Sequence, residues 1–539
     1  MVKSAHRAGP ILGVLLFAAG ILGAGAWLRG AEYDEQYTLF LTAGTPRPAW
    51  PDGVFPAGLA RKVQADRTDL RTIARHLRAT DVHPPLYFWM ATMWRGAVGN
   101  DLFALRLFSV ACGLGALAAV GAIARRASVP PVLAMLLTLG CYGFAYTSVI
   151  ARGFALAQCL TLCGIALLLR PDRPACRFAA GAAFGAAAMA NYLAAFVPLA
   201  ALALSATQVI RHRVAHLPGG AGRRSRAMPR PDGALPGSGM HPATSRTCGP
   251  DPPRIVPIAL GMLPFLAVDL WFFVAQHASR PGQFPPFTWI DSIARLARYS
   301  AATLFGGLPL YVNGRWQHAI SAALAGLLGL CLLLVSRQWR RIGRPDNRRL
   351  FLAAALAPPV GLLALGLVFN TTPIELRYLA FATPFAALLL AGAIGSLPTP
   401  MAGIVAAVVL ATQALSLACM MTRPETMQPA RAAARSVAEI GPAVLVLLPR
   451  GNDGVGIVGA FGIEAPPATP LTLIGGDDTP TQLRERLAGH ARVGLAILPQ
   501  DDASRRSLDM ARAVLSDECW RPSAATPWIE LFTWTCDPD

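Results

Sequence analysis

Long apolar runs fill the first 420 residues of the chain and alternate with short polar segments. About eleven of these runs have roughly 17–25 residues, a length that crosses a hydrocarbon core of about 30 Å as a helix. We predict spans at 11–28, 104–124, 130–149, 153–169, 178–191, 193–209, 255–275, 318–336, 350–369, 378–397 and 401–420. The pair 178–191 and 193–209 is alternatively one kinked helix, which would reverse the topology downstream.

Arginines orient the predicted spans, because basic residues in short loops resist translocation. They gather in alternate connections, at 125–126, 170–177, 211–254 and 337–349. These connections are predicted to be cytoplasmic. The outward set is 29–103, the turn at Arg152, 276–317, 370–377 and the tail from 421. Every basic loop agrees only with eleven spans, which favours two helices within 178–209.

The first span raises the question of a signal peptide, since Ala24-Gly25-Ala26 resembles a cleavage site. Its apolar run exceeds the usual length of about 7–15 residues, so an uncleaved helix is the favoured interpretation. The segment 211–254 is rich in Gly, Pro, Ser and Arg without apolar periodicity. That composition predicts a flexible cytoplasmic loop.

The tail, 421–539, has the pattern of a small soluble α/β domain. Helices are predicted near 429–439, 480–488 and 502–515, and strands at 444–448, 471–474, 493–498 and 528–534. Asp501 or Asp502 suits the N-cap of the last helix.

The segment Gly454-Val-Gly456-Ile-Val-Gly459 in this tail resembles a dinucleotide-binding fingerprint. Such a fingerprint needs its first glycine directly after a strand and a helix opening from the loop. Residues 449–453 intervene here, and Pro466-Pro467 would cut a helix short. We therefore interpret the segment as a glycine-rich loop without a cofactor.

Composition excludes a chain of several water-soluble domains. Hydrophobic residues make up 54% and charged residues only 14% of the chain, whereas soluble domains carry about 25% charged residues. The net charge of +18 lies between apolar runs. It therefore suggests contact with membrane lipids and no nucleic-acid partner. Of the ten cysteines, Cys519 and Cys536 fall in the polar tail and could pair if that tail is extracytoplasmic.

Polar side chains are densest in the outward loop 29–103. Asp34 and Glu35 follow the first span closely, and helical spacing places Tyr33, Tyr37 and Phe40 on one apolar face. A short helix on the membrane surface is predicted, with two carboxylates in its first turn. Stabilisation of the helix N-terminus is a sufficient role for the pair, and acid–base chemistry is the alternative.

A second polar motif, Asp81-Val-His83-Pro84-Pro85-Leu-Tyr87, stands near the end of the same loop. Pro84 keeps His83 extended, and Pro85 suits the first turn of a helix whose N–H groups point back toward His83. These groups, with a cationic imidazole, would hold an anion. In the alternative, the prolines only break the loop and the aromatic residues anchor the helix in the interface.

Two arginines, Arg152 and Arg377, are predicted where outward loops meet the membrane. A lipid phosphate is a natural partner for each guanidinium, and snorkelling to the headgroups is the alternative. Asp269, inside the seventh predicted span, suits a proton relay, or more simply a pair with a nearby Arg or Trp.

Taken in order, these motifs resemble those of the GT-C membrane glycosyltransferases. Within that group the sequence resembles the protein O-mannosyltransferase and lipid A aminoarabinose transferase superfamily, particularly its bacterial PMT-2, glycosyltransferase family 39-like branch. The motifs are the Asp34-Glu35 pair, the segment from Asp81 to Trp89, Leu105-Arg106-Leu107-Phe108-Ser109, Ala151-Arg152-Gly-Phe154-Ala-Leu156, and Arg377-Tyr378 followed by Pro384. The similarity covers about residues 10–400.

The resemblance implies a polyprenyl-phosphate-linked sugar donor and an outward-facing active site. Asp34 would be the catalytic base, with Glu35 beside it. The donor phosphate would be bound by His83, Arg152, Arg377 and Tyr378. Asp81 would be an acidic partner or a ligand of a divalent metal. Gln36 departs from the small residue usual after the acidic pair, and the short tail does not resemble a sugar-binding module, so the acceptor stays open.

The sequence thus predicts an all-α polytopic membrane protein of GT-C type, with about eleven transmembrane helices in 1–420 and a small periplasmic α/β domain in 421–539. The predicted function is inverting sugar transfer to a lipid, glycan or protein hydroxyl at the outer face of a bacterial inner membrane. Its substrate cleft would include Tyr37, Tyr87 and Trp289, with further aromatic residues of loop 276–317 at Tyr299, Tyr311 and Trp316. Two alternatives are a flippase for a lipid-linked precursor and a membrane-anchored scaffold acting through its tail.

Overall fold

The computed structural model describes residues 9–170, 173–215, 255–276, 285–310, 312, 314–422, 429–441, 443–451, 454–475, 478–499, 501–517 and 519–536. Most of the predicted cytoplasmic loop 211–254 lies outside the described residues, as do Tyr311 and Asp477.

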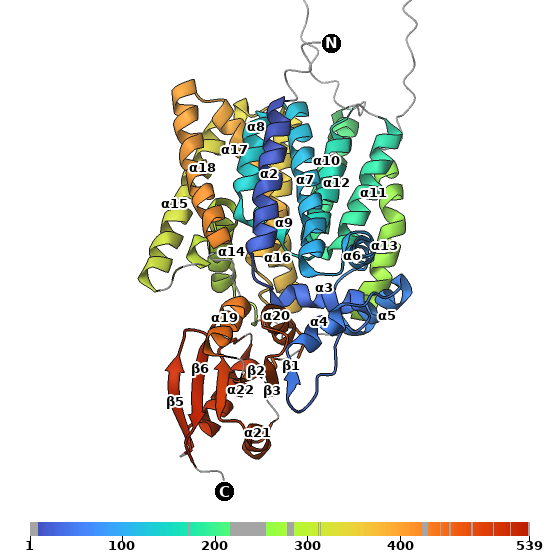
Figure 1. Cartoon of the computed structure of the whole chain (residues 1–539). Helices are drawn as coiled ribbons and strands as arrows, with labels where there is room; N and C mark the ends of the chain where they lie inside the picture. The colour runs from blue at the N-terminus through green and yellow to red at the C-terminus, as the bar shows by residue number, and fades with distance from the viewer. Residues whose placement is uncertain are drawn as a thin grey trace, which may run out of the picture.

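Apolar helices form a bundle in the upper part of Figure 1. Seven spans of the described chain are long and apolar enough to cross a membrane: α2 (Gly9–Leu28), α7 (Leu102–Arg126), α13 (Val256–Gln276), α15 (Arg315–Gln338) with η4 (Trp339–Arg341), α16 (Pro345–Phe369), η5 (Leu376–Ala382) with α17 (Thr383–Gly395), and α18 (Thr399–Thr422). An eighth is formed if α8 (Pro131–Gly140) and α9 (Tyr142–Val149), bent by 69°, are one span.

Three further helices, α10 (Phe154–Leu168), α11 (Pro174–Ala190) and α12 (Phe196–Ala215), occupy the other predicted segments. All eleven segments are therefore helical, although length and apolarity confirm only seven or eight as spans. The segment 178–209 forms two helices, because Asn191 is extended and its side chain accepts a hydrogen bond from Leu193 N at 3.0 Å, starting η1 (Tyr192–Ala195).

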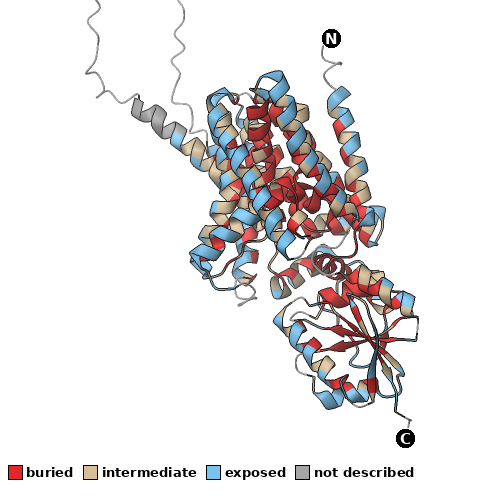
Figure 2. Cartoon of the chain, turned by 90° about the vertical axis from the view of Figure 1, so that its left-hand side faces the viewer, coloured by how far each residue is buried: buried red, intermediate tan, exposed pale blue. Residues whose placement is uncertain are grey.

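The outer surface of the bundle is apolar, as expected for helices surrounded by lipid. Leu270 on α13, Leu330 on α15 and Val360 on α16 are all exposed. Figure 2 shows the buried residues in the interior of the bundle and the exposed ones around it. The protein is therefore a multi-pass membrane protein.

Four helices of the first loop lie at one end of the bundle, between it and the C-terminal domain (Figure 1): α3 (Tyr33–Ala43), α4 (Gly58–Gln64), α5 (Leu70–Thr80) and α6 (Leu86–Val98). α14 (Trp289–Phe305) lies at the same end, and α2 begins at the opposite end. Two predicted cytoplasmic connections meet away from the first loop, because Val129 and Ile342 both pack against Gly392.

The C-terminal domain is built on a six-stranded sheet in the order β1-β3-β2-β4-β6-β5. The strands are β1 (Phe55–Pro56), β2 (Leu445–Pro449), β3 (Pro470–Ile474), β4 (Arg492–Ala496), β5 (Trp520–Ala525) and β6 (Ile529–Trp534). β2 runs parallel to β3 and β4, and the other pairs are antiparallel. This confirms a C-terminal α/β unit, with β5 as a strand that the hydrophobic pattern did not predict.

Alternate residues of the central strand β2 serve two cores, as expected for a sheet covered on both faces. Val446 and Leu448 pack with α19 (Ala430–Ile440) and α20 (Gly456–Glu464), in a cluster that also holds Tyr37 and Phe40 of α3. Leu445 and Leu447 pack on the other side with α21 (Pro480–Leu487) and α22 (Asp502–Val514).

Two details of the tail depart from the sequence prediction. The boundary at 421 does not isolate the tail, because β1 comes from the first loop and pairs with β3 through Phe55 and Leu471. The glycine-rich segment is also not a loop: Gly456 begins α20, and a β-carbon there would lie 2.0 Å from the Tyr33 ring. The glycine allows α20 to approach α3 closely.

Two other predictions for the tail are confirmed. Cys519 and Cys536 form a disulfide. Asp501 is the N-cap of α22, and its side chain accepts a hydrogen bond from Ser504 N at 2.8 Å.

Candidate active site

A cavity of about 580 Å³ opens between the first loop and the bundle. It is lined by Tyr33, Asp34, Tyr37, Asp81, Val82, His83, Arg152, Phe154, Arg377 and Tyr378. These residues come from four segments that are distant in sequence. Seven of the ten residues predicted for the site meet in this one cavity: Asp34, Tyr37, Asp81, His83, Arg152, Arg377 and Tyr378.

Asp34 is placed by the first turn of α3. Glu32 is the N-cap of this helix, and it forms a capping box with Glu35 in which each side chain binds the other residue's backbone N–H. Asp34 is buried, at 4% exposure, and pairs with Arg377 at the cavity wall. The acidic pair therefore divides: Asp34 faces the cavity, whereas Glu35 lies outside it.

Glu35 is fully buried and paired with Arg106 of α7. Arg106 Nε donates to Glu35 Oε1 at 2.8 Å, and Arg106 Nη2 is 2.5 Å from Oε2. The same guanidinium donates to the carbonyl oxygens of Ala26, Arg29 and Gly30. A carboxylate with these contacts can orient its neighbours but is not exposed to a substrate in the cavity.

Glu35 also fixes the turn that carries Arg152. The backbone N–H of Ala151 donates to Glu35 Oε1 at 2.8 Å, and Thr38 Oγ1 donates to the Ala151 carbonyl oxygen at 2.8 Å. Helix α3 therefore holds both Asp34 and the Arg152 turn in register. Glu35 thus holds the turn that carries Arg152 next to the helix that carries Asp34.

Arg152, His83 and Asp81 form a chain of side-chain contacts. Its Nη2 donates to His83 Nε2 at 2.9 Å, and His83 Nδ1 is 2.7 Å from Asp81 Oδ1. Because a guanidinium only donates, Nε2 accepts and the proton sits on Nδ1, facing Asp81. His83 is therefore a neutral imidazole that orients Arg152, in contrast to the cationic imidazole proposed from the sequence.

Arg152 also has a donor that makes no hydrogen bond to the described residues. The side chain is 5% exposed, and Nη1 is buried without a hydrogen-bond partner in the described part of the chain. A buried donor without a partner costs about 1–3 kcal/mol. An anion in the cavity would remove that cost.

Arg377 stands opposite, between two carboxylates. One edge pairs with Asp34, and Nε is 2.6 Å from Glu375 Oε2. Its guanidinium carbon lies 5.4 Å from the centre of the Tyr378 ring. Burial raises the pKa of the Glu375 carboxyl to about 7, while the adjacent guanidinium favours the ionised form.

Three predicted site residues do not line the cavity. Glu35 is in the buried cluster described above. Tyr87 is buried at the start of α6 against Phe88 and Phe108, and burial raises its pKa. Trp289 begins α14 and is 53% exposed, with its ring against Phe287. The aromatic walls of the cavity are instead Tyr33, Phe154 and Tyr378, together with the predicted Tyr37.

Asp269 makes no ion pair with a described residue. Both of its carboxylate oxygens are buried without a hydrogen-bond partner among the described residues. The nearby Arg78 instead stacks on Trp271, 3.8 Å from the centre of the ring.

The geometry bears directly on the alternative roles of Asp81. Its Oδ1 contacts both His83 and the backbone N–H of Val82, at 2.7 and 2.6 Å. Within the described ranges, no three His, Cys, Asp or Glu side chains gather as a metal site. The contacts of Asp81 fit an acidic partner of His83.

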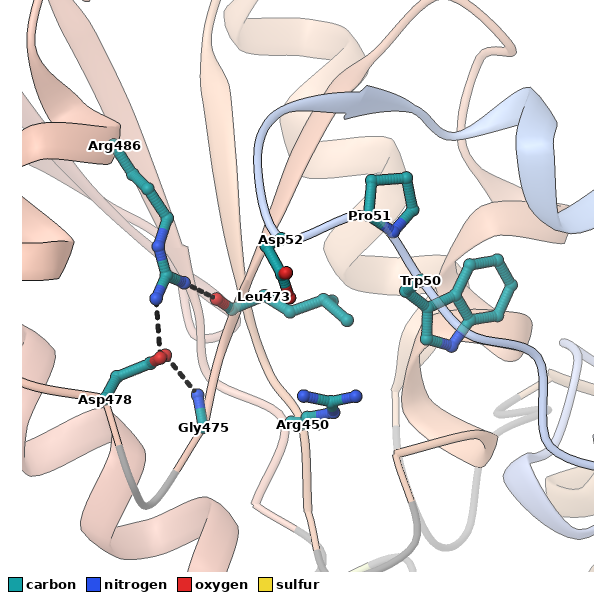
Figure 3. Close-up of a pocket in the computed structure, with 8 residues that line it drawn as sticks. All are labelled: Trp50, Pro51, Asp52, Arg450, Leu473, Gly475, Asp478 and Arg486. Carbon is teal, nitrogen blue, oxygen red and sulfur yellow. Dashed lines mark hydrogen bonds and ion pairs between the residues drawn. The ribbon is translucent and has the colours of Figure 1, made fainter.

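A second, smaller cavity of about 270 Å³ lies at the seam between the first loop and the C-terminal domain (Figure 3). Its lining is Trp50, Pro51, Asp52, Arg450, Leu473, Gly475, Asp478 and Arg486. Asp478 and Arg486 pair at 2.5 Å, and Asp478 also accepts from Gly475 N at 2.7 Å. None of the predicted site residues lines this cavity.

Sequence reasoning assigned no role to Arg106 or Glu375. Arg106 was noticed only as part of a family motif, yet an arginine in the first turn of an apolar span requires a buried anion. Glu375 stands two residues before Arg377, and that spacing was its only signal.

Comparison with known proteins agrees with this architecture. Residues 82–222 match the model of the family described as dolichyl-phosphate-mannose-protein mannosyltransferase. The crystal structure of ArnT from Cupriavidus metallidurans bound to undecaprenyl phosphate is similar over 97% of this chain and 98% of that one, with 12% identity and a TM-score of 0.52. The chain has the GT-C fold.

The apo structure of the same ArnT gives 11% identity over 98% of each chain and a TM-score of 0.51. A comparison with curated protein sequences finds no match. The likeness therefore extends over both the bundle and the C-terminal sheet, and it agrees with the GT-C fold that the motifs indicate. At this identity it concerns the fold, so residue roles rest on the cavity itself.

Proposed function

We propose that this protein is an inverting glycosyltransferase that moves a sugar from a polyprenyl-phosphate donor to an acceptor hydroxyl on the outer side of the membrane. The observation that carries the proposal is a carboxylate, Asp34, in one cavity with two arginines, Arg152 and Arg377, at the edge of an apolar bundle. The GT-C fold, and a relative solved with undecaprenyl phosphate, support the choice of donor.

The arginines suit a phosphate leaving group. When the bond between the anomeric carbon and the phosphate oxygen breaks, its electron pair stays on the phosphate and the negative charge grows. Fixed cations placed at that charge stabilise the transition state more than the ground state. Arg152 brings a buried donor that no described residue accepts from, and His83 with Asp81 keeps its guanidinium in place.

Asp34 suits the general base. It would take the proton of the acceptor hydroxyl as the hydroxyl oxygen bonds to the anomeric carbon, a contribution typically worth about 10²–10⁴-fold in rate. Attack from the face opposite the phosphate inverts the anomeric centre. The sequence of events needs no nucleotide, since the phosphate is already on the lipid.

The side of the membrane follows from the charge pattern. Helix α3, which carries Asp34, lies at the end of the bundle that faces the C-terminal domain (Figure 1), and the arginine-rich connections are predicted at the other end. Basic loops stay cytoplasmic, so the cavity would face the periplasm of a bacterial inner membrane. The Cys519–Cys536 disulfide fits an oxidising compartment. The acceptor is a lipid, glycan or protein hydroxyl.

The test is transfer from a radiolabelled polyprenyl-phosphate sugar in membrane vesicles containing the full chain. Asp34→Asn should lower transfer by at least about 100-fold at unchanged protein level, because the amide cannot accept the proton. The matched control is Asp66→Asn, an exposed carboxylate of the same loop outside the cavity, which should leave transfer unchanged. Equal transfer by Asp34→Asn and wild type would reject the proposal.

A further inference from the structure

Arg377 is shared by two carboxylates. Asp34 pairs with one edge of the guanidinium, and Glu375 lies 2.6 Å from its Nε. The arginine side chain is 11% exposed and that of Glu375 31%. Nothing in the family resemblance explains a second carboxylate at this point.

The contact with Asp34 opposes the role of a base. A neighbouring cation stabilises a carboxylate in its ionised form and so lowers its affinity for a proton. While Arg377 holds Asp34, the carboxylate is a weak base toward a hydroxyl in the cavity. The proposed reaction therefore needs a step that separates the two groups.

A donor phosphate can supply that step. Its oxygens accept hydrogen bonds from a guanidinium, so the phosphate competes with the Asp34 carboxylate for Nη1 of Arg377. The exchange preserves geometry only if another contact keeps the guanidinium at the wall. The Glu375 contact at Nε is on the side that the exchange leaves intact.

We infer that Glu375 is a positioning residue that anchors Arg377 at Nε while its other edge passes from Asp34 to the donor phosphate. The inference rests on the proposed function. Asp34 is freed when the donor is bound, and it then takes the acceptor proton while the anomeric carbon–phosphate bond breaks with its electron pair on the phosphate. Donor binding thus precedes activation of the base.

The experiment measures binding of undecaprenyl phosphate, which has no sugar to transfer, to the purified full chain in lipid nanodiscs. Asp34→Asn should bind about tenfold more tightly than wild type, because the competing charge is gone, although the same variant has lost transfer. Glu375→Ala should bind about tenfold more weakly, because Asp34 then captures the unanchored guanidinium. Glu375→Gln keeps an oxygen at the position of Glu375 Oε2, 2.6 Å from Arg377 Nε, and should restore part of the affinity.

Asp66→Asn is the matched control and should bind as wild type does. Unchanged affinity in Asp34→Asn, or in Glu375→Ala, with normal binding by wild type overturns this inference and leaves the proposed function standing. Failure of the wild type to bind the lipid phosphate overturns both. Melting curves of Glu375→Ala and Glu375→Gln show whether each variant is folded. If neither melts cooperatively, the affinity of Asp34→Asn for undecaprenyl phosphate decides whether the inference holds.

Discussion

The two adjacent carboxylates of α3, Asp34 and Glu35, have very different surroundings. Asp34 opens onto a cavity and shares one arginine with Glu375, whereas Glu35 is closed off by Arg106 and by the backbone N–H groups of Glu32 and Ala151. The cavity around Asp34 contains groups whose hydrogen-bonding capacity is not used up, such as Arg152 Nη1.

The difference shows how a rigid polar cluster supports a reactive one. A buried ion pair contributes to stability only when its remaining hydrogen bonds are made, and the Glu35–Arg106 pair meets that condition through three carbonyl oxygens. The Glu35–Arg106 pair holds α3 and the Arg152 turn in place. Asp34 and Arg152 therefore do not need to bind each other, and polar atoms of both remain available to a ligand. Substitutions in the two regions should therefore fail in different ways.

The largest effect is expected from breaking the closed cluster. Arg106→Met leaves the Glu35 carboxylate buried without its cation, which should cost about 3–5 kcal/mol of stability. Thermal melting of the purified protein in detergent measures the loss. Arg125→Met, at the exposed end of the same helix, is the control and should melt as wild type does. An unchanged melting temperature for Arg106→Met would remove the distinction between the regions.

A smaller and different effect is expected in the cavity. Arg152→Ala would remove the proposed charge-assisted hydrogen bond to the donor phosphate, worth about 1.5–3 kcal/mol, so affinity for undecaprenyl phosphate should fall by about 10–100-fold. The melting temperature should change little. Titration of the lipid into the purified chain tests this, with Arg125→Ala as the control. Wild-type affinity in Arg152→Ala would contradict the assignment of its free donor.

The packing of α20 against Tyr33 can be disturbed by a substitution that leaves Asp34 and Glu35 unchanged. Gly456→Ala would place a β-carbon 2.0 Å from the Tyr33 ring, and overpacking of this kind costs about 1–3 kcal/mol. Because Tyr33 lines the cavity beside Asp34, transfer should fall several-fold while the bundle remains folded. Gly403→Ala, with open space around it, should be neutral. Equal transfer by both variants would show that α20 does not support the site.

The smallest effect is expected far from both regions. Asp501→Ala removes the N-cap of α22 and should destabilise that helix by about 1 kcal/mol. Hydrogen exchange of α22 should become faster, while affinity for undecaprenyl phosphate stays at the wild-type value. A parallel loss of lipid affinity would extend the functional region across the sheet.

Local signals in the sequence predicted much of this architecture. Apolar runs located the helices, the motif order located Asp34, Arg152 and Arg377, and period-two patterns located β2, β3, β4 and β6. Each of these depends on residues adjacent in the chain or on one face of one element. Such local signals were sufficient to identify seven of the residues that line the cavity.

Contacts between distant segments escaped prediction. Nothing local shows that Glu35 belongs to Arg106, that β1 joins a sheet at the other end of the chain, or that the glycines at 456 and 459 serve close packing against α3. The tautomer of His83 also follows from a residue 69 positions away. These features depend on the three-dimensional neighbours, which one sequence does not reveal.

The edge strand β1 has a consequence for biogenesis. The first loop emerges early in synthesis, but its partners for Phe55 and Trp50, on β3 and at Gly454, are among the last residues to be made, and Trp50 binds Gly454 across a separation of 404 positions. Such long-range pairing is slow and waits for the whole polypeptide. A nascent chain that ends before residue 454 would carry every acid and arginine of the cavity but would lack the α20 packing behind Tyr33, so the cavity would reach its final shape only after the C-terminal domain has been made.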